Sequence, residues 1–130
     1  IPADMMSDRL ASDNAGLAFI MAEVMQSPLL HLRLNAISTD ACRRFHVDNM
    51  TARMLCTYRG AGTQLAQPGQ EQTAQDVPTG AAAILRGALW PGAEATSLLH
   101  RSPPIGDTGQ IRLLLVIDPA LDHRADGTVH

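Results

Sequence analysis

The fold of this chain is decided by the stretch IRLLLVI, residues 111–117. Every residue in it except Arg112 is apolar, and its β-branched side chains pack well on a pleated sheet. An apolar run that does not alternate with polar residues is typical of a strand buried on both faces. The sequence therefore predicts a β-rich core in which this strand has other elements packed against each face.

The other strand patterns are shorter. Residues 30–36 alternate Leu or Ala with His, Arg and Asn, which indicates a half-buried strand. Further strands are expected at 50–58, at 82–85, at 95–100 and, within an irregular segment at 59–80, near Thr63–Leu65. Long irregular segments in a domain of this size are often functional.

A helical pattern precedes the strands, at residues 7–26. Ser7 or Asp8 could cap its start, and Pro28 ends it because the residue before a proline is pushed out of helical geometry. One helix followed by many short strands fits a sandwich or a small barrel. The apolar stripe of the helix consists of Leu10, Leu17, Ile20, Met21, Val24 and Met25.

Composition narrows the classes of function. The length of 130 residues suits one domain, and 45% hydrophobic against 18% charged residues exclude a disordered chain. The net charge of −3, the scattered basic residues and the few aromatic ones argue against nucleic-acid binding. No apolar run reaches the ~18 residues that a membrane span needs. Two cysteines and no signal peptide favour a reducing, cytoplasmic location.

The strongest functional signal is the triplet His46-Val47-Asp48 together with His100. On a strand, residues two apart point to the same face, so His46 and Asp48 would point the same way. A second histidine from another strand would complete a set of two histidines and one carboxylate. Such a set leaves positions on the metal open and suits non-haem iron(II).

The same residues also have ordinary explanations. His46 could lie on the surface, Asp48 could begin a turn with Asn49, and His100 could bond a backbone carbonyl. A zinc site built from Cys42, His46 and Cys56 is conceivable because thiolate and imidazole both suit zinc. The cysteine spacing matches no common structural zinc pattern, which favours buried free thiols.

Arg112 is a candidate for binding a cosubstrate, because a buried arginine is costly unless it is paired. Its guanidinium could fork onto the carboxylate of a 2-oxo acid, or it could open the strand at an exposed end and pair with Asp107 or water. Tyr58 and Arg59 could face the same cavity and bind an anionic substrate. For these two residues the sequence leaves the question open, while Gly60 and Gly62 favour a simple turn.

Three blocks of sequence together resemble a bacterial family known as domain of unknown function 1826. They are RFHVD at 44–48, CTYRGAGT at 56–63 and HRSPP at 100–104. The resemblance runs from about Leu30 to Asp118. Members are usually longer at the N-terminus, and this chain begins at Ile1 rather than Met. We therefore expect one domain over residues 1–130, the C-terminal part of a longer protein, with a helix at 7–26, a β-core at 30–118 and a tail at 119–130.

This resemblance implies a fold more clearly than a function. Genes of the family are often associated with zinc-responsive regulation, which implies a role in zinc homeostasis. The order His-x-Asp…His is also similar to that of the iron(II)/2-oxoglutarate oxygenases, which have a jelly-roll, cupin-like fold. It implies a mainly β, double-stranded β-helix with an N-terminal α-helix. In it, His46, Asp48 and His100 would bind Fe(II) or Zn(II), and Arg112 would anchor 2-oxoglutarate. Leu114 stands where that superfamily often has Ser, which counts against 2-oxoglutarate but not against a metal.

Three functions follow as hypotheses. The first is an iron(II)-dependent, dioxygenase-like enzyme acting on a small molecule. The second is a non-catalytic zinc-binding module, and the third is a metal-free β-sandwich that binds a small molecule or a partner. The sequence leaves the substrate, the native metal and the oligomeric state open.

Overall fold

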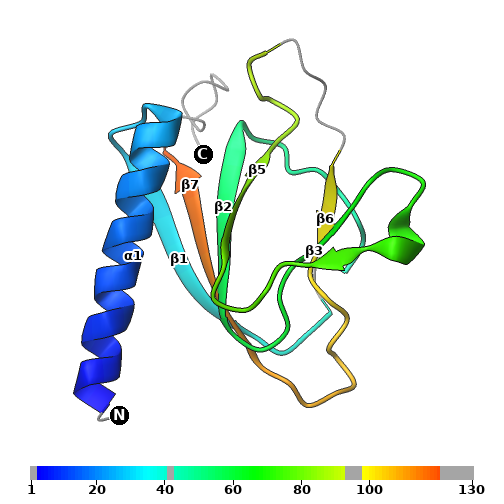
Figure 1. Cartoon of the computed structure of the whole chain (residues 1–130), viewed down its shortest axis with the longest axis horizontal. Coiled ribbons are helices and arrows are strands. Elements are labelled where there is room, and N and C mark those ends of the chain that lie inside the picture. Colours follow the sequence, from blue (N-terminus) through cyan, green and yellow to red (C-terminus); the bar gives the residue numbers. More distant parts are fainter. Residues whose placement is uncertain (1–2, 41–42, 93–97, 121–130) are drawn as a thin grey trace.

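The computed structural model describes residues 3–40, 43–92 and 98–120. Within them the chain forms one long helix, α1 (Ala3–Met25), a single turn η1 (Glu71–Thr73), and two antiparallel sheets (Figure 1). The larger sheet has the order β1 (Leu30–Ile37), β7 (Arg112–Pro119), β2 (Ala52–Arg59) and β5 (Ala82–Arg86). The smaller has the order β4 (Gln75–Asp76), β3 (Gln64–Ala66) and β6 (Leu99–Arg101).

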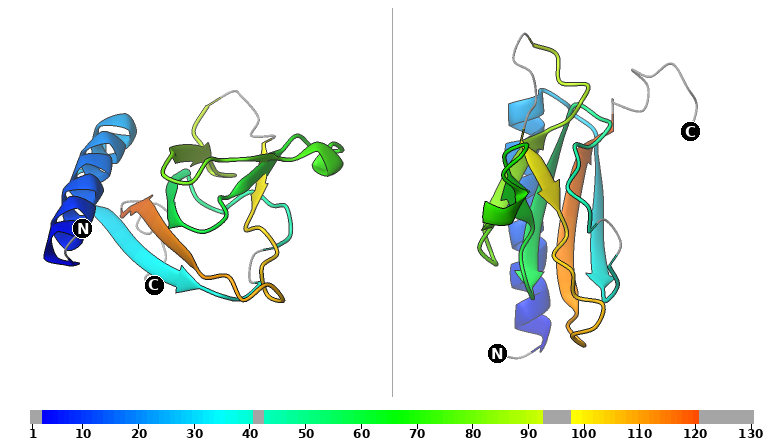
Figure 2. Two further views of the ribbon diagram at one scale, coloured as in Figure 1. Left: turned by 60° about the horizontal axis from the view of Figure 1, so that its bottom comes forward. Right: turned by 90° about the vertical axis from the view of Figure 1, so that its right-hand side faces the viewer.

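The two sheets and the helix form layers. α1 lies along one side of the larger sheet and the smaller sheet lies on the other side (Figures 1 and 2). This arrangement confirms the expected mainly β fold with an N-terminal helix. No helix within the described ranges has both the length and the apolar character that crossing a membrane would require.

Strand β7 is the centre of the larger sheet, as the stretch IRLLLVI predicts. It pairs with β1 on one side and with β2 on the other, and it is buried on both faces. The face toward α1 packs Leu115 and Ile117 with Met21, Ala52, Met54 and Cys56. The opposite face packs Leu114 and Val116 with Leu55 and Leu85, and Leu65 of β3 packs against this group. Two separate layers therefore cover one continuous apolar strand.

The helix is longer than the sequence pattern predicts. It begins at Ala3, so Ser7 and Asp8 lie inside it rather than at its cap; the Ala-Asp-Met-Met start contains no helix breaker. It ends at Met25, and Gln26 takes a left-handed conformation with φ of 50°. Of the predicted stripe, Leu17, Met21 and Met25 pack toward the sheet, whereas Ile20 and Val24 are exposed.

Strand β1 turns its polar face inward. Residues directly opposite each other in an antiparallel pair share a face. Arg33 lies opposite Val116, and Asn35 opposite Leu114, so both belong to the face that meets the smaller sheet. Leu32 and Leu34 belong to the helix face, yet both are exposed. The alternation in β1 was predicted from the sequence. Its polar side chains, however, lie on the face of the larger sheet that meets the smaller sheet.

The remaining elements are short. The predicted strand near Thr63–Leu65 is confirmed as β3, and the segment 59–80 also holds η1 and β4. The strand expected at 95–100 is observed as β6, beginning at Leu99, while residues 93–97 lie outside the described ranges. The expected tail lies outside them from residue 121 onward.

Candidate metal centre

Two histidines that are far apart in sequence lie side by side in the structure. His46 and His100 form an isolated antiparallel bridge, in which each backbone N–H donates to the other's carbonyl oxygen at 2.9 and 3.0 Å. β6 in turn pairs with β3, with His100 opposite Leu65. The ring centroids of the two histidines are 4.4 Å apart. Backbone pairing therefore places both imidazoles on one side of the smaller sheet.

Asp48 is positioned by a different set of backbone bonds. The N–H of Ala88 donates to the carbonyl oxygen of Asp48 at 2.8 Å, and Gly87 and Leu89 donate to Thr51 and Met50 at 2.8 and 3.0 Å. This close approach needs glycine at position 87, because an added Cβ would collide with the Met50 carbonyl oxygen. The turn after β5 thus fixes the segment that carries Asp48.

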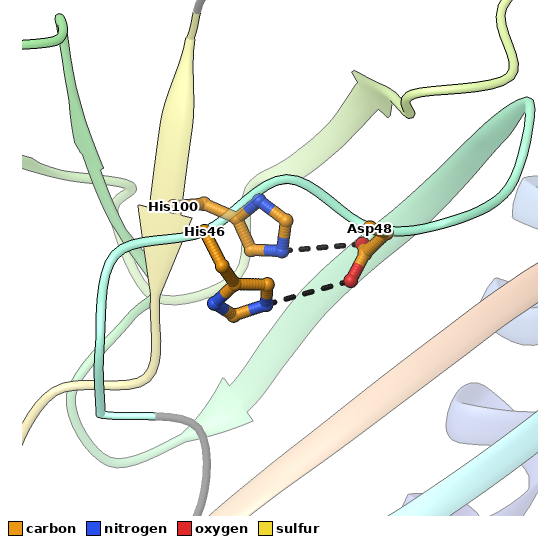
Figure 3. A group of neighbouring side chains, drawn as sticks. All are labelled: His46, Asp48 and His100. Atoms are coloured by element: carbon orange, nitrogen blue, oxygen red, sulfur yellow. Dashed lines mark ion pairs between the residues drawn. The ribbon is translucent and has the colours of Figure 1, made fainter.

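The three predicted ligands converge (Figure 3). Nε2 of His46 lies 3.4 Å from Oδ1 of Asp48, and Nε2 of His100 lies 3.2 Å from Oδ2. One donor atom from each residue falls within 4.8 Å of the others. Ligands about 2.1 Å from one ion are separated by roughly 3.0–3.4 Å when their angles run from right to tetrahedral. Both histidine–aspartate separations are therefore those expected of two ligands on one ion.

The hydrogen bonding of His46 leaves its Nε2 available to bind a metal ion. Nδ1 of His46 lies 2.7 Å from the carbonyl oxygen of Arg44. A carbonyl oxygen only accepts, so Nδ1 must carry the proton. In the neutral ring the lone pair then belongs to Nε2, the atom that faces Asp48. Metal-binding histidines are commonly oriented by such a bond from their second nitrogen.

Asp48 is held as a carboxylate. Burial raises the pKa of its carboxyl group, but the contact with His100 and the charges of His100, Arg53 and His46 lower it more, so the pKa lies below its usual value. The Asp48 side chain is 10% exposed and that of His100 8%, against 35% for His46. Oδ2 of Asp48 is buried and receives no well-aligned hydrogen bond within the described part of the chain. A buried carboxylate oxygen of this kind is a natural place for a cation.

Arg53 connects this cluster to the larger sheet. Its Nε and NH2 donate to the two carboxylate oxygens of Asp118 at 2.7 and 3.0 Å. Its NH1 lies 3.4 Å from Oδ1 of Asp48. A forked arginine–carboxylate pair of this geometry is stronger and more directional than a single contact. Arg53 therefore orients Asp48 while Asp118 balances its charge.

A cavity of about 600 Å³ opens beside the three residues. Its floor is the apolar face of the larger sheet, with Leu55, Leu114 and Val116. One side is lined by the three candidate ligands, referred to below as the triad, together with Thr63, and another side is lined by β1. Polar and charged side chains in its lining include Arg33, Asn35, Arg53, Arg101 and Ser102. The centre can thus be reached by a small molecule.

Arg112 is buried but does not line this cavity. It lies on the cavity-facing side of β7, where its Nε donates to the Ala61 carbonyl oxygen at 2.6 Å and its NH2 to the hydroxyls of Thr57 and Thr63 at 3.2 and 3.3 Å. Burial lowers the pKa of its guanidinium. NH1 is buried without a hydrogen-bond partner in the described ranges, and no pairing with Asp107 occurs there. Thr63 lines the cavity and lies between it and Arg112.

Tyr58, Arg59 and the cysteines lie away from the cavity. Tyr58 packs on the helix side of the larger sheet, and its hydroxyl donates to Oδ1 of Asn14 at 3.0 Å. Arg59 is exposed at the end of β2. Cys56 is a buried free thiol in the helix-side core, which places it on the other side of the sheet from His46 and His100. Cys42 lies outside the described ranges.

Sequence reasoning missed the arginines around the site. Arg53 alternates with Leu55 and Thr57 on one face of β2, so a charged residue inside an otherwise buried strand was a readable signal. Its partner Asp118, near the end of the most apolar strand, is a second charged residue in a buried strand and a second sign of a buried ion pair. Arg33 and Asn35 were visible only as the polar half of an alternating strand.

Comparison with known proteins gives structural likenesses at low sequence identity. The chain is similar to the structure of FeII HppE in complex with substrate, with a TM-score of 0.44 and 15% identity over 72% of this chain and 47% of that chain. It is also similar to hydroxypropylphosphonic acid epoxidase from S. wedmorenis, with a TM-score of 0.42 and 14% identity over 70% of this chain and 44% of that chain. The chain therefore spans less than half the length of these structures.

No curated protein matches the chain. The family model described as "Protein of unknown function (DUF1826)" matches residues 1–118, which is nearly the whole of the chain. On this match, the chain belongs to the DUF1826 family of proteins of unknown function.

Proposed function

We propose that this protein binds one divalent metal ion, iron(II), through Nε2 of His46, Asp48 and Nε2 of His100, and acts as an oxygenase-like enzyme on a small molecule. The observation that carries the proposal is the convergence of these three donors, brought from two distant segments, at the edge of a cavity of about 600 Å³. Two histidines and one carboxylate leave the remaining metal positions open.

The donor set favours iron(II) over a structural metal. Structural zinc sites are closed by four protein ligands, usually with cysteine. Here Cys56 lies in the helix-side core, and among the described residues the group of side chains that could hold a metal ion consists of the two histidines and Asp48. Bound in such an open site, iron(II) supplies the dioxygen chemistry that amino-acid side chains lack. The residues of the chain then orient the ligands and admit the substrate.

A 2-oxo acid is the cosubstrate that Arg112 would favour. Its NH1 is buried without a partner among the described residues, and a guanidinium forks readily onto a carboxylate. The carboxylate would have to reach Arg112 past Thr63, whose hydroxyl is 3.3 Å from NH2 of Arg112. Leu114 lines the cavity at the position where the oxygenase superfamily often has Ser, so the cosubstrate contact would rest on Arg112 alone.

Metal analysis tests the proposal directly. Protein purified without a metal-affinity tag should bind about one equivalent of iron(II) under anaerobic conditions, and the ion should raise the melting temperature by mass action. His46→Ala and His100→Ala should each lose both effects. His31→Ala serves as the matched control, because His31 is exposed and does not line the cavity.

The outcomes separate the hypotheses. Equal iron(II) binding by the wild type and both variants would overturn the assigned ligands. Tight zinc binding with no uptake of iron(II) would favour a zinc-binding module instead. Consumption of 2-oxoglutarate by the iron-loaded protein, lost in Arg112→Met, would support the cosubstrate; consumption unchanged in that variant would refute the role of Arg112.

A further inference from the structure

We propose that the cavity beside the candidate metal centre binds a small organic anion, whose acid group is held at β1 by Arg33 and Asn35 and attracted from the opposite rim by Arg101. Carboxylate and phosphoryl groups both fit this description, since both accept hydrogen bonds from the same donors. This inference names the substrate class of the proposed metal enzyme and so rests on that function. The anion is the substrate, distinct from any cosubstrate at Arg112.

The charge of the cavity lining is opposite to that of the chain. The whole chain carries a net charge of −3, yet the lining contains three arginines, Arg33, Arg53 and Arg101, and Asp48 is its only carboxylate among the described residues. Arg53 is balanced by Asp118. Clefts lined by one sign of charge concentrate ligands of the other sign. A bound divalent cation would add to this positive field.

Among the described residues, no carboxylate pairs with the two remaining arginines, Arg33 and Arg101. Arg101 donates through Nε to Oε1 of Gln64 at 2.7 Å, and its guanidinium lies 4.4 Å from the ring centroid of Phe45. Both partners are neutral, so they orient Arg101 without cancelling its charge. Arg33 forms no ion pair and no side-chain hydrogen bond within the part of the chain that the structure describes, and the amide of Asn35 is likewise unpaired there. These donors are available to a ligand.

The register of the larger sheet gives the ligand an amphipathic site. Arg33, Val116 and Leu55 lie in one row across β1, β7 and β2, and Asn35 and Leu114 lie in the next row. Neighbouring strands are about 4.8 Å apart, so the backbone of Arg33 is roughly 10 Å from β2, over which the triad stands. An acid group at β1 would therefore place an apolar carbon body on Val116 and Leu55, with its far end toward the metal centre.

The inward polar face of β1 has a cost that a binding role explains. Turning Arg33 and Asn35 toward the cavity leaves Leu32 and Leu34 exposed on the other face. Departures from the usual apolar-in, polar-out pattern concentrate at functional sites. The competing explanation is protection of an edge strand, because inward-pointing charges prevent edge-to-edge pairing. That explanation requires no ligand, and the two can be separated by experiment.

Calorimetric titration of metal-free protein with butanoate, butyl phosphate and 1-butanol provides the test. We expect the two anions to bind and the alcohol not to bind, with the better anion identifying the acid group. Arg33→Gln should weaken anion binding about 10-fold, the loss expected for charge-assisted hydrogen bonds at a partly exposed site. Arg33→Lys keeps the charge but not the forked donor geometry, so its affinity for the anion should lie between those of the wild type and Arg33→Gln. Arg59→Gln, an exposed arginine outside the cavity, is the matched control and should bind as the wild type does.

Two results would overturn the inference. One is that Arg33→Gln binds the anion as tightly as the wild type does, whether or not the variant also self-associates. Protection of the edge strand would then be the role left for Arg33. The other is equal binding of 1-butanol and butanoate. Repeating the titration on His46→Ala separates the two proposals: retained anion binding together with normal metal binding in that variant would refute the metal centre and leave the anion site standing.

Discussion

Arg53 links the stability of the sheet to the geometry of the metal centre, and removing it should affect both. Its forked pair with Asp118, at 2.7 and 3.0 Å, joins side chains that are only 21% and 9% exposed. Breaking a fully buried pair by removing one partner costs about 3–5 kcal/mol, because the other charge is stranded. Allowing for the partial exposure of Arg53, we expect Arg53→Ala and Asp118→Ala each to lower the free energy of unfolding by about 2–3 kcal/mol.

A double-mutant cycle measures the pair itself. The double variant removes both charges, so it should cost less than the sum of the single variants by about 1–3 kcal/mol. Urea unfolding, followed by the fluorescence of the single tryptophan, Trp90, gives all four free energies. Arg86→Ala is the control arginine: Arg86 is exposed, its substitution removes a stacking contact 5.1 Å from the Trp90 ring centroid, and it should cost about 0.5–1 kcal/mol.

Metal affinity adds a second, independent readout. In Asp118→Ala the unbalanced guanidinium of Arg53 would pair more closely with Asp48, now 3.4 Å away, and would compete with the metal ion. We expect affinity for iron(II) to fall about 10-fold in Asp118→Ala and to recover in the double variant, the scale typical of groups that orient metal ligands. Strictly additive free energies of unfolding, together with unchanged metal affinity in Asp118→Ala, would refute this account of Arg53.

Three further predictions concern the turn beside the site and the helix-side core. Gly87→Ala should lower the free energy of urea unfolding by about 1–3 kcal/mol and weaken metal binding, because its Cβ would press on the carbonyl oxygens of the segment carrying Asp48; wild-type values for both would contradict the packing described. Burial raises the pKa of the Tyr58 hydroxyl, so the stability it contributes is present below its ordinary pKa of 10.0 and is lost as pH rises toward the folded value; Tyr58→Phe should reduce the loss of unfolding free energy above pH 10. Burial also raises the pKa of the Cys56 thiol, so in a Cys42→Ser background iodoacetamide should label it slowly in native protein and rapidly in urea.

The central strand and its burial could be predicted because they depend on local pattern. The continuous apolar run at 111–117 requires cover on both faces, and the structure supplies α1 on one face and the smaller sheet on the other. The strands around 30–36, 50–58 and 82–85 were also readable, to within one or two residues at most ends. The length of the helix could not be predicted, because its N-terminal residues from Ala3 onward contain neither a helix breaker nor part of the apolar stripe that the sequence shows from Leu10.

The orientation of each strand could not be read from its alternation. A period of two shows which side chains share a face, but it does not show which layer covers that face. Thus Tyr58 follows Met54 and Cys56 onto the helix side, away from the cavity, while Arg53 and Leu55 face it. The same ambiguity hid the role of Arg33 and Asn35. Only the register with β7 places them over the cavity floor.

The pairing of His46 with His100 is a long-range event that local sequence does not encode, and it is weakly supported by the rest of the fold. β6 has three residues, and the bridge between the two histidines consists of two backbone hydrogen bonds. Each such bond contributes a net of about 0.5–1.5 kcal/mol. Apolar packing holds the larger sheet together, whereas His46 and His100 contact each other through these two hydrogen bonds and through their imidazole rings. An ion bound by His46, Asp48 and His100 would therefore add more to the order of this region than the bridge does. Stability of the smaller sheet and occupancy of the metal centre should rise and fall together, because the ion would be bound by His100 of β6 and by His46, which pairs with it.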